Sequence, residues 1–336
     1  MSGPATIIPI AGGKGGIGKS IIAANLAVSL ARLGKSVVAV DLDLGGSNLH
    51  SYLGLPNTLP SIGDYLKKQG SDFNEYLHPT WQHNLRFLPG DGRTPFLANI
   101  NYGHKVKLIR NLKTVEADYV LVDLGAGSSF NTLDYFAMSP RGVLVTTTEQ
   151  PALMGMMVFL KNLVFRVIEK NLKSNKDVCD FLHNIFSQPI TAEKITLTEL
   201  QQRIAEYHPE SGVMVNQICH HFRPRLIMNW GSSPDDLANK LEPASRAINK
   251  MLSLDVEHFG FVFDDPTVHD AIEAGSPLID YDPECLAVRC INVIAERIIK
   301  LWDSKIEESD KKLLLHTQNM YHELRTQALA GKSGAF

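Results

Sequence analysis

Short apolar runs alternate with longer helical patterns along much of the chain. The runs of β-branched and aliphatic residues predict buried strands at residues 7–11, 35–40, 84–89, 118–122, 141–148, 212–219 and 256–262. Between them, apolar positions at helical spacing predict helices at residues 21–33, 105–115, 151–170, 235–252 and 283–302. Strands that alternate with helices form parallel sheets covered on both faces. The sequence therefore predicts an α/β fold, a mostly parallel twisted sheet flanked by helices.

Two segments depart from this alternation. Residues 171–211 are polar, with helical patterns at 177–186 and 197–207, and they are too long for an ordinary loop. We expect one domain over residues 1–302 that carries a helical insertion at about 171–211. Residues 303–336 are expected to form a C-terminal helical tail. Within the helix predicted at 235–252, Pro243 marks a break or the start of a second helix.

A glycine-rich stretch, residues 12–20 (GGKGGIGKS), joins the first predicted strand to the first predicted helix. From Gly13 to Ser20 it fits G-x-x-x-x-G-K-[ST], the phosphate-binding loop of P-loop NTPases. Backbone N–H groups and the helix N-terminus can cradle a triphosphate, while Lys19 reaches the β- and γ-phosphates and Ser20 ligates Mg²⁺. The residues expected to bind nucleotide here are Gly13, Lys14, Gly15, Gly16, Ile17, Gly18, Lys19, Ser20 and Ile21.

Carboxylates follow two of the predicted strands. Asp41 and Asp43 end one apolar run, and Asp123 ends another before Leu-Gly-Ala-Gly. Ligands of open α/β sheets lie outside the carboxyl ends of the strands, so these acids are expected at the edge of the sheet where ligands bind. Asp123 fits a Walker B carboxylate that reaches Mg²⁺ through a water. Helix capping or a surface turn is the alternative, and it is strongest for Asp41.

These motifs together resemble one family. Residues 14–20 (KGGIGKS) look like the deviant Walker A motif of the MinD/ParA ATPases, and residues 41–49 (DLDLGGSNL) resemble the D-x-D-x-G-x-x-N-L stretch of MinD and its flagellar relative FlhG. Residues 123–127 are similar to their D-x-x-A-G switch. The FlhG/MinD branch is the one that the chain looks most like.

The resemblance implies an ATPase that converts ATP and water to ADP and phosphate. It implies catalytic roles for Lys14, Lys19, Asp43 and Asp123, where Lys14 crosses a nucleotide-sandwich dimer to the partner's ATP and Asp43 positions the attacking water. Ser20, Asp43 and Asp123 are the residues expected around Mg²⁺.

The resemblance also implies an adenine pocket. Strands of this family place an Asn at the adenine, so Asn216 in the strand predicted at 212–219 is expected to contact the base. Asp264 and Pro266, after the last predicted strand, are expected to line the same pocket. A loop-capping role is the alternative for Asn216.

Composition limits the compartment and the chemistry. Of 336 residues, 44 % are hydrophobic and 21 % charged, and the net charge of −3 gives no global case for nucleic acid or anionic lipid. No apolar run is expected to reach the roughly 20 residues of a membrane span, and no leader pattern is recognised, so we expect a cytoplasmic protein. The four cysteines have no C-x-x-C spacing and are expected to be reduced core thiols.

The resemblance implies a slow ATP-dependent dimerising switch that regulates spatial positioning of a flagellum, a division site or another cargo. It implies a homodimer in the ATP state and a protein partner that stimulates hydrolysis. A ParA-type DNA-binding partition ATPase is the alternative, supported only by modest basic clusters such as Lys105, Lys107 and Arg110. An iron–sulfur or electron-transfer ATPase is a third class, disfavoured by the cysteine spacing. The acidic residues of the tail disfavour membrane binding.

Overall fold

The computed structural model describes residues 4–68, 70–90, 100–173, 176–186, 197–252 and 254–333. Its centre is an eight-stranded sheet in the order β3-β4-β2-β5-β1-β6-β7-β8, in which the β3–β4 pair is antiparallel and the other pairs are parallel. The strands are β1 (Thr6–Ala11), β2 (Val37–Leu42), β3 (His78–Pro79), β4 (Leu85–Leu88), β5 (Tyr119–Leu124), β6 (Val143–Thr147), β7 (Arg225–Gly231) and β8 (Glu257–Phe263). The predicted mostly parallel α/β fold is confirmed.

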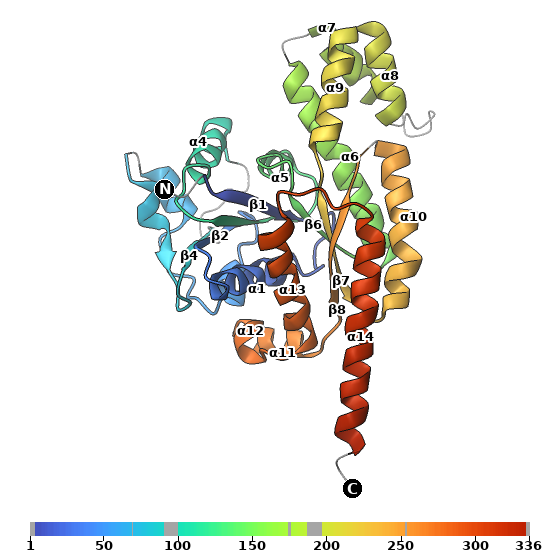
Figure 1. Ribbon diagram of the computed structural model, residues 1–336. Helices are drawn as coiled ribbons and strands as arrows, with labels where there is room; N and C mark the ends of the chain where they lie inside the picture. Colours follow the sequence, from blue (N-terminus) through green and yellow to red (C-terminus); the bar gives the residue numbers. More distant parts are fainter. Residues whose placement is uncertain are drawn as a thin grey trace.

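Helices cover both faces of this sheet (Figure 1). The longer helices of the sheet body are α1 (Lys19–Arg32), α4 (Tyr102–Leu112), α5 (Phe130–Phe136), α6 (Gln150–Leu172), α10 (Pro234–Leu252) and α13 (Leu286–Leu301). Short helices are α2 (Leu49–Tyr52), α3 (Ile62–Lys67), η1 (Phe73–Tyr76), α11 (Thr267–Glu273) and α12 (Leu278–Tyr281).

The side chains of the strands contribute to two separate hydrophobic cores, because successive side chains of a strand point to opposite faces of the sheet. In β2, Val38 and Val40 belong to the core that includes α4, α5 and α6. Val37 and Ala39 belong to the core formed with α1 and α13. Every residue of β2 is buried, as expected for a strand inside a parallel sheet that is covered on both faces.

Three helices extend the chain beyond the sheet between α6 and β7. These are α7 (Lys176–Phe186), α8 (Leu197–Tyr207) and α9 (Pro209–His221), which form the upper lobe in Figure 1. Parts of the segment expected as an insertion, residues 174–175 and 187–196, lie outside the described residues. We call α7, α8 and α9 the inserted lobe.

The strand predicted at residues 212–219 is wrong. These residues belong to α9, which starts at Pro209 with His208 as its N-cap, and the sheet strand follows at Arg225–Gly231. A short apolar run does not distinguish a helix from a strand by periodicity. The true strand begins with a charged residue, Arg225, which is fully buried because it pairs with Glu257 at 3.0 Å.

The C-terminal helix α14 (Ser309–Ser333) lies against β8 and α10. Tyr321 stacks on Phe263 with ring centres 5.8 Å apart, which ties this helix to the edge strand. Side chains beyond residue 323 lie outside the described residues. Helix α10 runs unbroken through Pro243, so the predicted break there is wrong.

By length and composition, helix α6 is apolar enough to cross a membrane, contrary to the sequence-based expectation. No other helix of the described ranges meets that test. Within the fold, α6 contacts α5, α9, α10 and β6. Its buried residues include Phe159, Leu160 and Leu163, which is the pattern of a core helix in a folded domain.

Candidate nucleotide-binding site

The glycine-rich stretch forms a loop from the end of β1 to the start of α1. We call residues 12–18 the phosphate loop. Gly16 and Gly18 have φ values of 72° and 83°, a left-handed conformation that favours glycine. Helix α1 has no side-chain cap among the described residues, so its first N–H groups face the loop unpaired by a side chain. The local structure is the strand–loop–helix that an anion site requires.

Helix α6 supports the phosphate loop through direct backbone contact. A Cβ on Gly13 would lie 2.0 Å from the carbonyl oxygen of Gly155 in α6. On the other side, the Gly12 carbonyl oxygen accepts a hydrogen bond of 3.1 Å from the Gly127 N–H. The phosphate loop is therefore held between α6 and residues 125–129, which we call the switch loop.

Two buried carboxylates lie side by side on the neighbouring strands β2 and β5. Asp41 of β2 is the register partner of Asp123 of β5, and both are fully buried. Asp41 accepts hydrogen bonds from the Ser47 hydroxyl (2.7 Å) and the Leu49 N–H (3.1 Å), so it anchors the loop after β2. Burial raises the pKa of Asp41, and these hydrogen bonds act in the opposite direction.

Asp123 differs from Asp41 because neither of its carboxylate oxygens has a hydrogen-bond partner among the described residues. Burial raises the pKa of Asp123, and the Asp41 carboxylate raises it further. The Ser20 hydroxyl and the Lys19 ammonium are close enough to lower that pKa, although neither makes a hydrogen bond of ordinary geometry with Asp123. Buried, unsatisfied carboxylate oxygens beside a serine hydroxyl fit a Mg²⁺ ion held with a nucleotide.

The two lysines of the loop region occupy different environments. Lys19, at the first position of α1, is only 8 % exposed, whereas Lys14 is exposed on the phosphate loop. Asp43 is half-buried and faces the switch loop, since a Cβ on Gly125 would lie 3.0 Å from its Oδ1. The structure thus brings Lys19, Ser20, Asp43 and Asp123 to one sheet edge, with Lys14 outside them.

The adenine-contact prediction for Asn216 loses its basis, because Asn216 is exposed on α9 rather than placed at a strand end. The strand end is occupied by Asn229 of β7, which is buried and donates a hydrogen bond of 2.9 Å to the Ile17 carbonyl oxygen. Asp264 and Pro266 follow β8 and are both exposed. The Asp264 N–H donates to the Gly231 carbonyl oxygen at 3.0 Å, so the two strand ends meet.

Trp230 is a further residue of this edge that the sequence-based reasoning missed. It follows Asn229, is partly exposed, and has a φ of 58°. A bulky residue in the left-handed region is strained, and such strain concentrates at functional sites. A sequence signal for it exists, because the stretch Asn-Trp-Gly-Ser follows an apolar run. Placing the strand at residues 212–219 left this run unassigned.

The fold and this loop define a P-loop NTPase. A family model, ParA, described as NUBPL iron-transfer P-loop NTPase, matches residues 4–199, which is more than half of the chain. The chain therefore belongs to the MinD/ParA family of P-loop NTPases.

Similar sequences include septum site-determining proteins and an iron-sulfur cluster carrier protein. The septum site-determining protein MinD of Helicobacter pylori is 38 % identical over 124 residues, which cover 37 % of this chain and 46 % of that protein. The MinD of Synechocystis is 34 % identical over 147 residues, covering 44 % and 54 %. The iron-sulfur cluster carrier protein of Bacillus subtilis is 30 % identical over 166 residues, covering 45 % and 42 %. The chain thus spans about half the length of the curated relatives that it matches.

Solved structures share the fold. MinD of Pyrococcus horikoshii, complexed with Mg-ADP, has a TM-score of 0.56 at 22 % identity, covering 90 % of this chain and all of that chain. A chain of the MinC:MinD cell division protein complex of Aquifex aeolicus has a TM-score of 0.57 at 19 % identity, covering 91 % of this chain and 100 % of that chain. A ParA family ATPase of Chlorobium tepidum has a TM-score of 0.54 at 18 % identity, covering 86 % and 98 %.

Proposed function

We propose that the protein is an ATP-dependent dimerising switch of the FlhG/MinD kind that hydrolyses ATP slowly and positions a cargo such as a flagellum or a division site. The observation that carries the proposal is the contrast between the loop lysines, with Lys19 buried beside Asp123 and Lys14 exposed. One lysine can serve the nucleotide of its own chain, and the other is available to a nucleotide held by a second copy. This contrast supports a site that two chains complete.

The residues would divide the work as follows. The phosphate loop and Lys19 hold the phosphates, Asn229 keeps the loop against β7, and Asp264 and Pro266 stand beside the base. Ser20 and Asp123, with Asp43 nearby, would hold Mg²⁺, which supplies electrostatic stabilisation of the transferring phosphoryl group when bound. Asp43, facing the switch loop, orients the attacking water.

A partner protein and a cytoplasmic location complete the proposal. The MinC:MinD complex of Aquifex aeolicus supports the idea that this fold offers a surface to a protein partner. A switch whose loops respond to the γ-phosphate can release such a partner on hydrolysis. A ParA-like DNA surface is the weaker reading, because Lys105, the first of the basic cluster on α4, is buried and paired with Asp134.

An iron–sulfur carrier function is the second candidate, favoured by the family description and the Bacillus subtilis relative. Against it stand the thiols themselves. Cys219, Cys285 and Cys290 are buried, and burial raises the pKa of each, to about 11, 11 and 12. Thiols of this kind are poor cluster ligands, because the thiolate is the form that binds iron.

The experiment that tests the proposed switch is an Asp43→Ala variant. We expect it to bind ATP, to lose turnover and to accumulate as an ATP-bound dimer, measured by phosphate release and light scattering. Normal turnover of Asp43→Ala would contradict the proposed water-orienting role, and a monomer with ATP bound would contradict the switch. Absorbance near 400 nm after anaerobic iron and sulfide reconstitution would support the carrier instead.

A further inference from the structure

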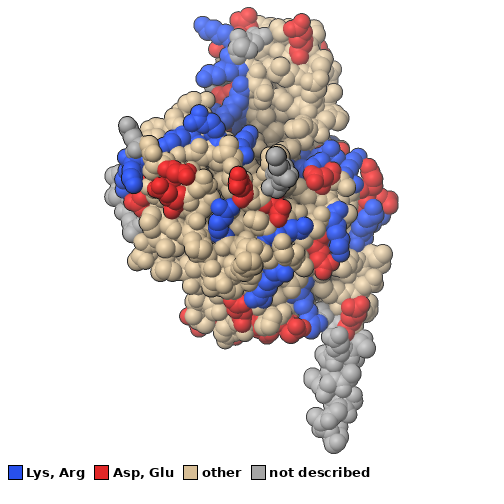
Figure 2. Space-filling model, turned by 60° about the vertical axis from the view of Figure 1, so that its left-hand side comes forward, with Lys and Arg blue, Asp and Glu red and all other residues tan. Residues whose placement is uncertain are grey.

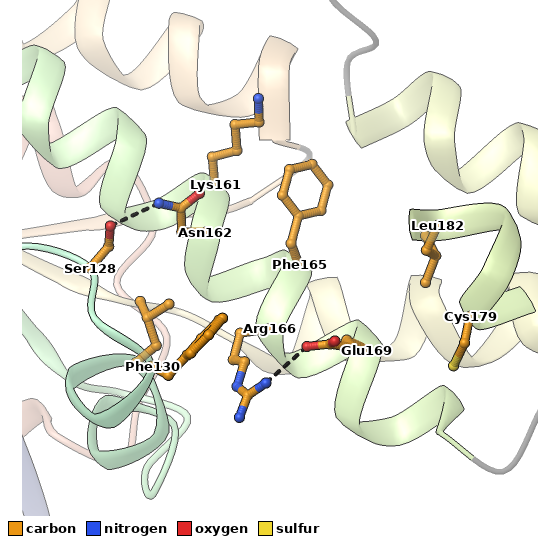
Figure 3. A pocket seen from close by; sticks show the side chains of 10 residues that line it. Ser128, Phe130, Lys161, Asn162, Phe165, Arg166, Glu169, Cys179 and Leu182 are labelled. Carbon is orange, nitrogen blue, oxygen red and sulfur yellow. Dashed lines mark hydrogen bonds and ion pairs between the residues drawn. The ribbon is translucent and has the colours of Figure 1, made fainter. Parts of the chain in front are cut away.

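A cavity of about 430 Å³ lies where the switch side of the sheet body meets the inserted lobe (Figure 3). Ser128 of the switch loop and Phe130, at the start of α5, form one wall. Cys179 and Leu182 of α7 form another. The volume falls within the roughly 300–1,000 Å³ of ligand pockets. The cavity therefore touches both the nucleotide switch and the inserted lobe.

Aromatic rings and cations meet at this cavity. Phe130 is 68 % exposed, and the Arg166 guanidinium lies 4.7 Å from its ring centre. The Lys161 ammonium lies 5.5 Å from the ring centre of Phe165. Figure 3 shows Phe130 and Arg166 approaching each other from α5 and α6. The lining therefore offers apolar surface with positive charge beside it.

The two cations are held differently. Arg166 donates hydrogen bonds to Asp134 and Glu169, both at 2.9 Å, so its position is fixed. Lys161 makes no ion pair with any described residue. Beside them, the Asn162 amide donates to the Ser128 hydroxyl at 2.8 Å, and that hydroxyl retains a hydrogen to donate. Lys161 and Ser128 are therefore available to an anionic group.

The apolar surface continues beyond the cavity along α6. Met154 and Val158 are 60 % and 51 % exposed, and their spacing to Lys161 and Phe165 places all four on one stripe of the helix. This stripe is about 16 Å long, or about three helical turns. A small molecule filling the cavity would leave Met154 and Val158 uncovered, whereas an amphipathic helix lying in the groove would cover them.

The surrounding charge is positive. The charged side chains of the cavity lining and the groups paired with them are Lys105, Lys161, Arg166 and Lys170 against Asp134 and Glu169, so cations outnumber acids there. Figure 2 shows lysine and arginine side chains gathered on the inserted lobe and at its junction with the sheet body. Charge complementarity therefore favours an acidic occupant.

We propose that this groove, lined by Phe130, Met154, Val158, Lys161, Phe165 and Leu182, binds an acidic amphipathic segment of a partner protein. The apolar side chains of the bound segment pack between Phe130 and Phe165, and one carboxylate of that segment pairs with Lys161. The proposal rests on the proposed function, since it assigns a site to the partner that stimulates hydrolysis. Occupancy acts on the nucleotide because Ser128 belongs to the switch loop, whose Gly127 is hydrogen-bonded to the phosphate loop.

The test uses a fluorescein-labelled helical peptide of about three turns, with leucine and phenylalanine on one face and glutamate elsewhere. Its counterpart carries lysine in place of glutamate. Binding to the full chain is followed by anisotropy, and occupancy by the rate at which maleimide alkylates Cys179. This residue lines the cavity and, of the four cysteines, is the one that is not buried. We expect the acidic peptide to bind and to slow alkylation several-fold, and the basic peptide to do neither.

Variants locate the binding site. Phe130→Ala and Lys161→Glu should each weaken the acidic peptide about tenfold, as the loss of a central interface residue does. Val213→Ala is the matched control, because Val213 is 60 % exposed on α9, outside the groove, and should have no effect.

Several results would overturn the proposal. These are no binding of the acidic peptide, equal binding of the basic peptide, or binding insensitive to Phe130→Ala and Lys161→Glu. Protection of Cys179 that rises with protein concentration alone would assign the groove to a second copy, and protection by dodecanoate but not by the peptide would assign it to a small amphiphile. Nucleotide binding and ATP-dependent dimerisation of Lys161→Glu are measured in parallel and should be unchanged. If the parent chain binds the acidic peptide but does not dimerise with ATP, the proposed switch is rejected and the proposed peptide site is retained.

Discussion

The side-chain amide of Asn229 donates a hydrogen bond of 2.9 Å to the carbonyl oxygen of Ile17, joining β7 to the phosphate loop across 212 positions of the sequence. Gly18 completes the contact, because a Cβ there would lie 2.2 Å from the Asn229 nitrogen. The conformation of the loop therefore depends on a strand that enters the sheet far later in the chain.

Asn229→Ala should weaken ADP binding several-fold. The buried hydrogen bond that holds Ile17 is lost, which is worth about 1 kcal/mol. Isothermal titration calorimetry with Mg-ADP measures the change. Asn216→Ala is the matched control, because Asn216 is exposed on α9 and should bind ADP normally. Equal losses in the two variants would contradict the assignment of Asn229.

Gly13→Ala should destabilise the protein by about 1–3 kcal/mol, the usual range for overpacking. The added Cβ would meet the Gly155 carbonyl oxygen at 2.0 Å, so the phosphate loop and α6 must separate. Thermal unfolding of the nucleotide-free protein measures the effect. In the same loop, a Cβ on Gly15 would meet nothing nearer than Ala126 at 3.9 Å, so Gly15→Ala should keep the parent midpoint. Similar midpoints for the two variants would argue against the close contact.

Asp134→Asn should cost about 3 kcal/mol of unfolding free energy, as the breaking of a buried ion pair does. The Asp134 side chain is buried on α5 and pairs with Lys105 of α4 and with Arg166 and Lys170 of α6. Urea unfolding at neutral pH measures the loss. Asp303→Asn is the control, because the Asp303 carboxylate is 92 % exposed in its pair with Arg141 and should contribute almost nothing.

The same cluster predicts a pH dependence. Burial alone would raise the pKa of Asp134, but hydrogen bonds from Arg166, Lys105 and Lys170 lower it to about 2. A carboxyl whose pKa is lower in the folded state stabilises the fold above its unfolded pKa of about 3.9. The stabilisation is lost as the pH falls from about 4 through 2. The difference in unfolding free energy between the parent and Asp134→Asn should therefore shrink from pH 5 to pH 2.5. A difference that stays constant over this range would contradict the lowered pKa of Asp134.

Local patterns were enough to predict the glycine loop, the parallel sheet and the acid at the end of β5. Each is a contiguous signal: Lys19 and Ser20 close a spaced motif, and Asp123 ends an uninterrupted apolar run. The predicted role of Lys14 at a partner's nucleotide comes from the family resemblance alone. The spacing of the motif assigns no function to this lysine.

What failed depended on contacts between distant segments. The start of β7 is hard to predict because its first residue, Arg225, is charged. Its burial is stabilised by the ion pair with Glu257 and by the rings of Phe259 and Trp302, whose centres each lie 4.5 Å from the guanidinium. The misplaced strand assigns the strand-end asparagine to Asn216, whereas the asparagine near the end of β7 is Asn229. The contact between Gly13 and Gly155 has no sequence signature either, since it depends on how α6 crosses the loop.

The central claim is that two chains complete one nucleotide site through Lys14. The most direct measurement is the light-scattering mass of the parent protein and of Lys14→Ala with ATP and Mg²⁺, each in the Asp43→Ala background that should prevent turnover. Lys113→Ala, an exposed lysine at the opposite end of the sheet, is the control. We predict about twice the 37.2 kDa chain mass for Asp43→Ala alone and with Lys113→Ala, and the chain mass for Asp43→Ala with Lys14→Ala, although it still binds ATP. A dimer that forms equally well without Lys14 would contradict the account.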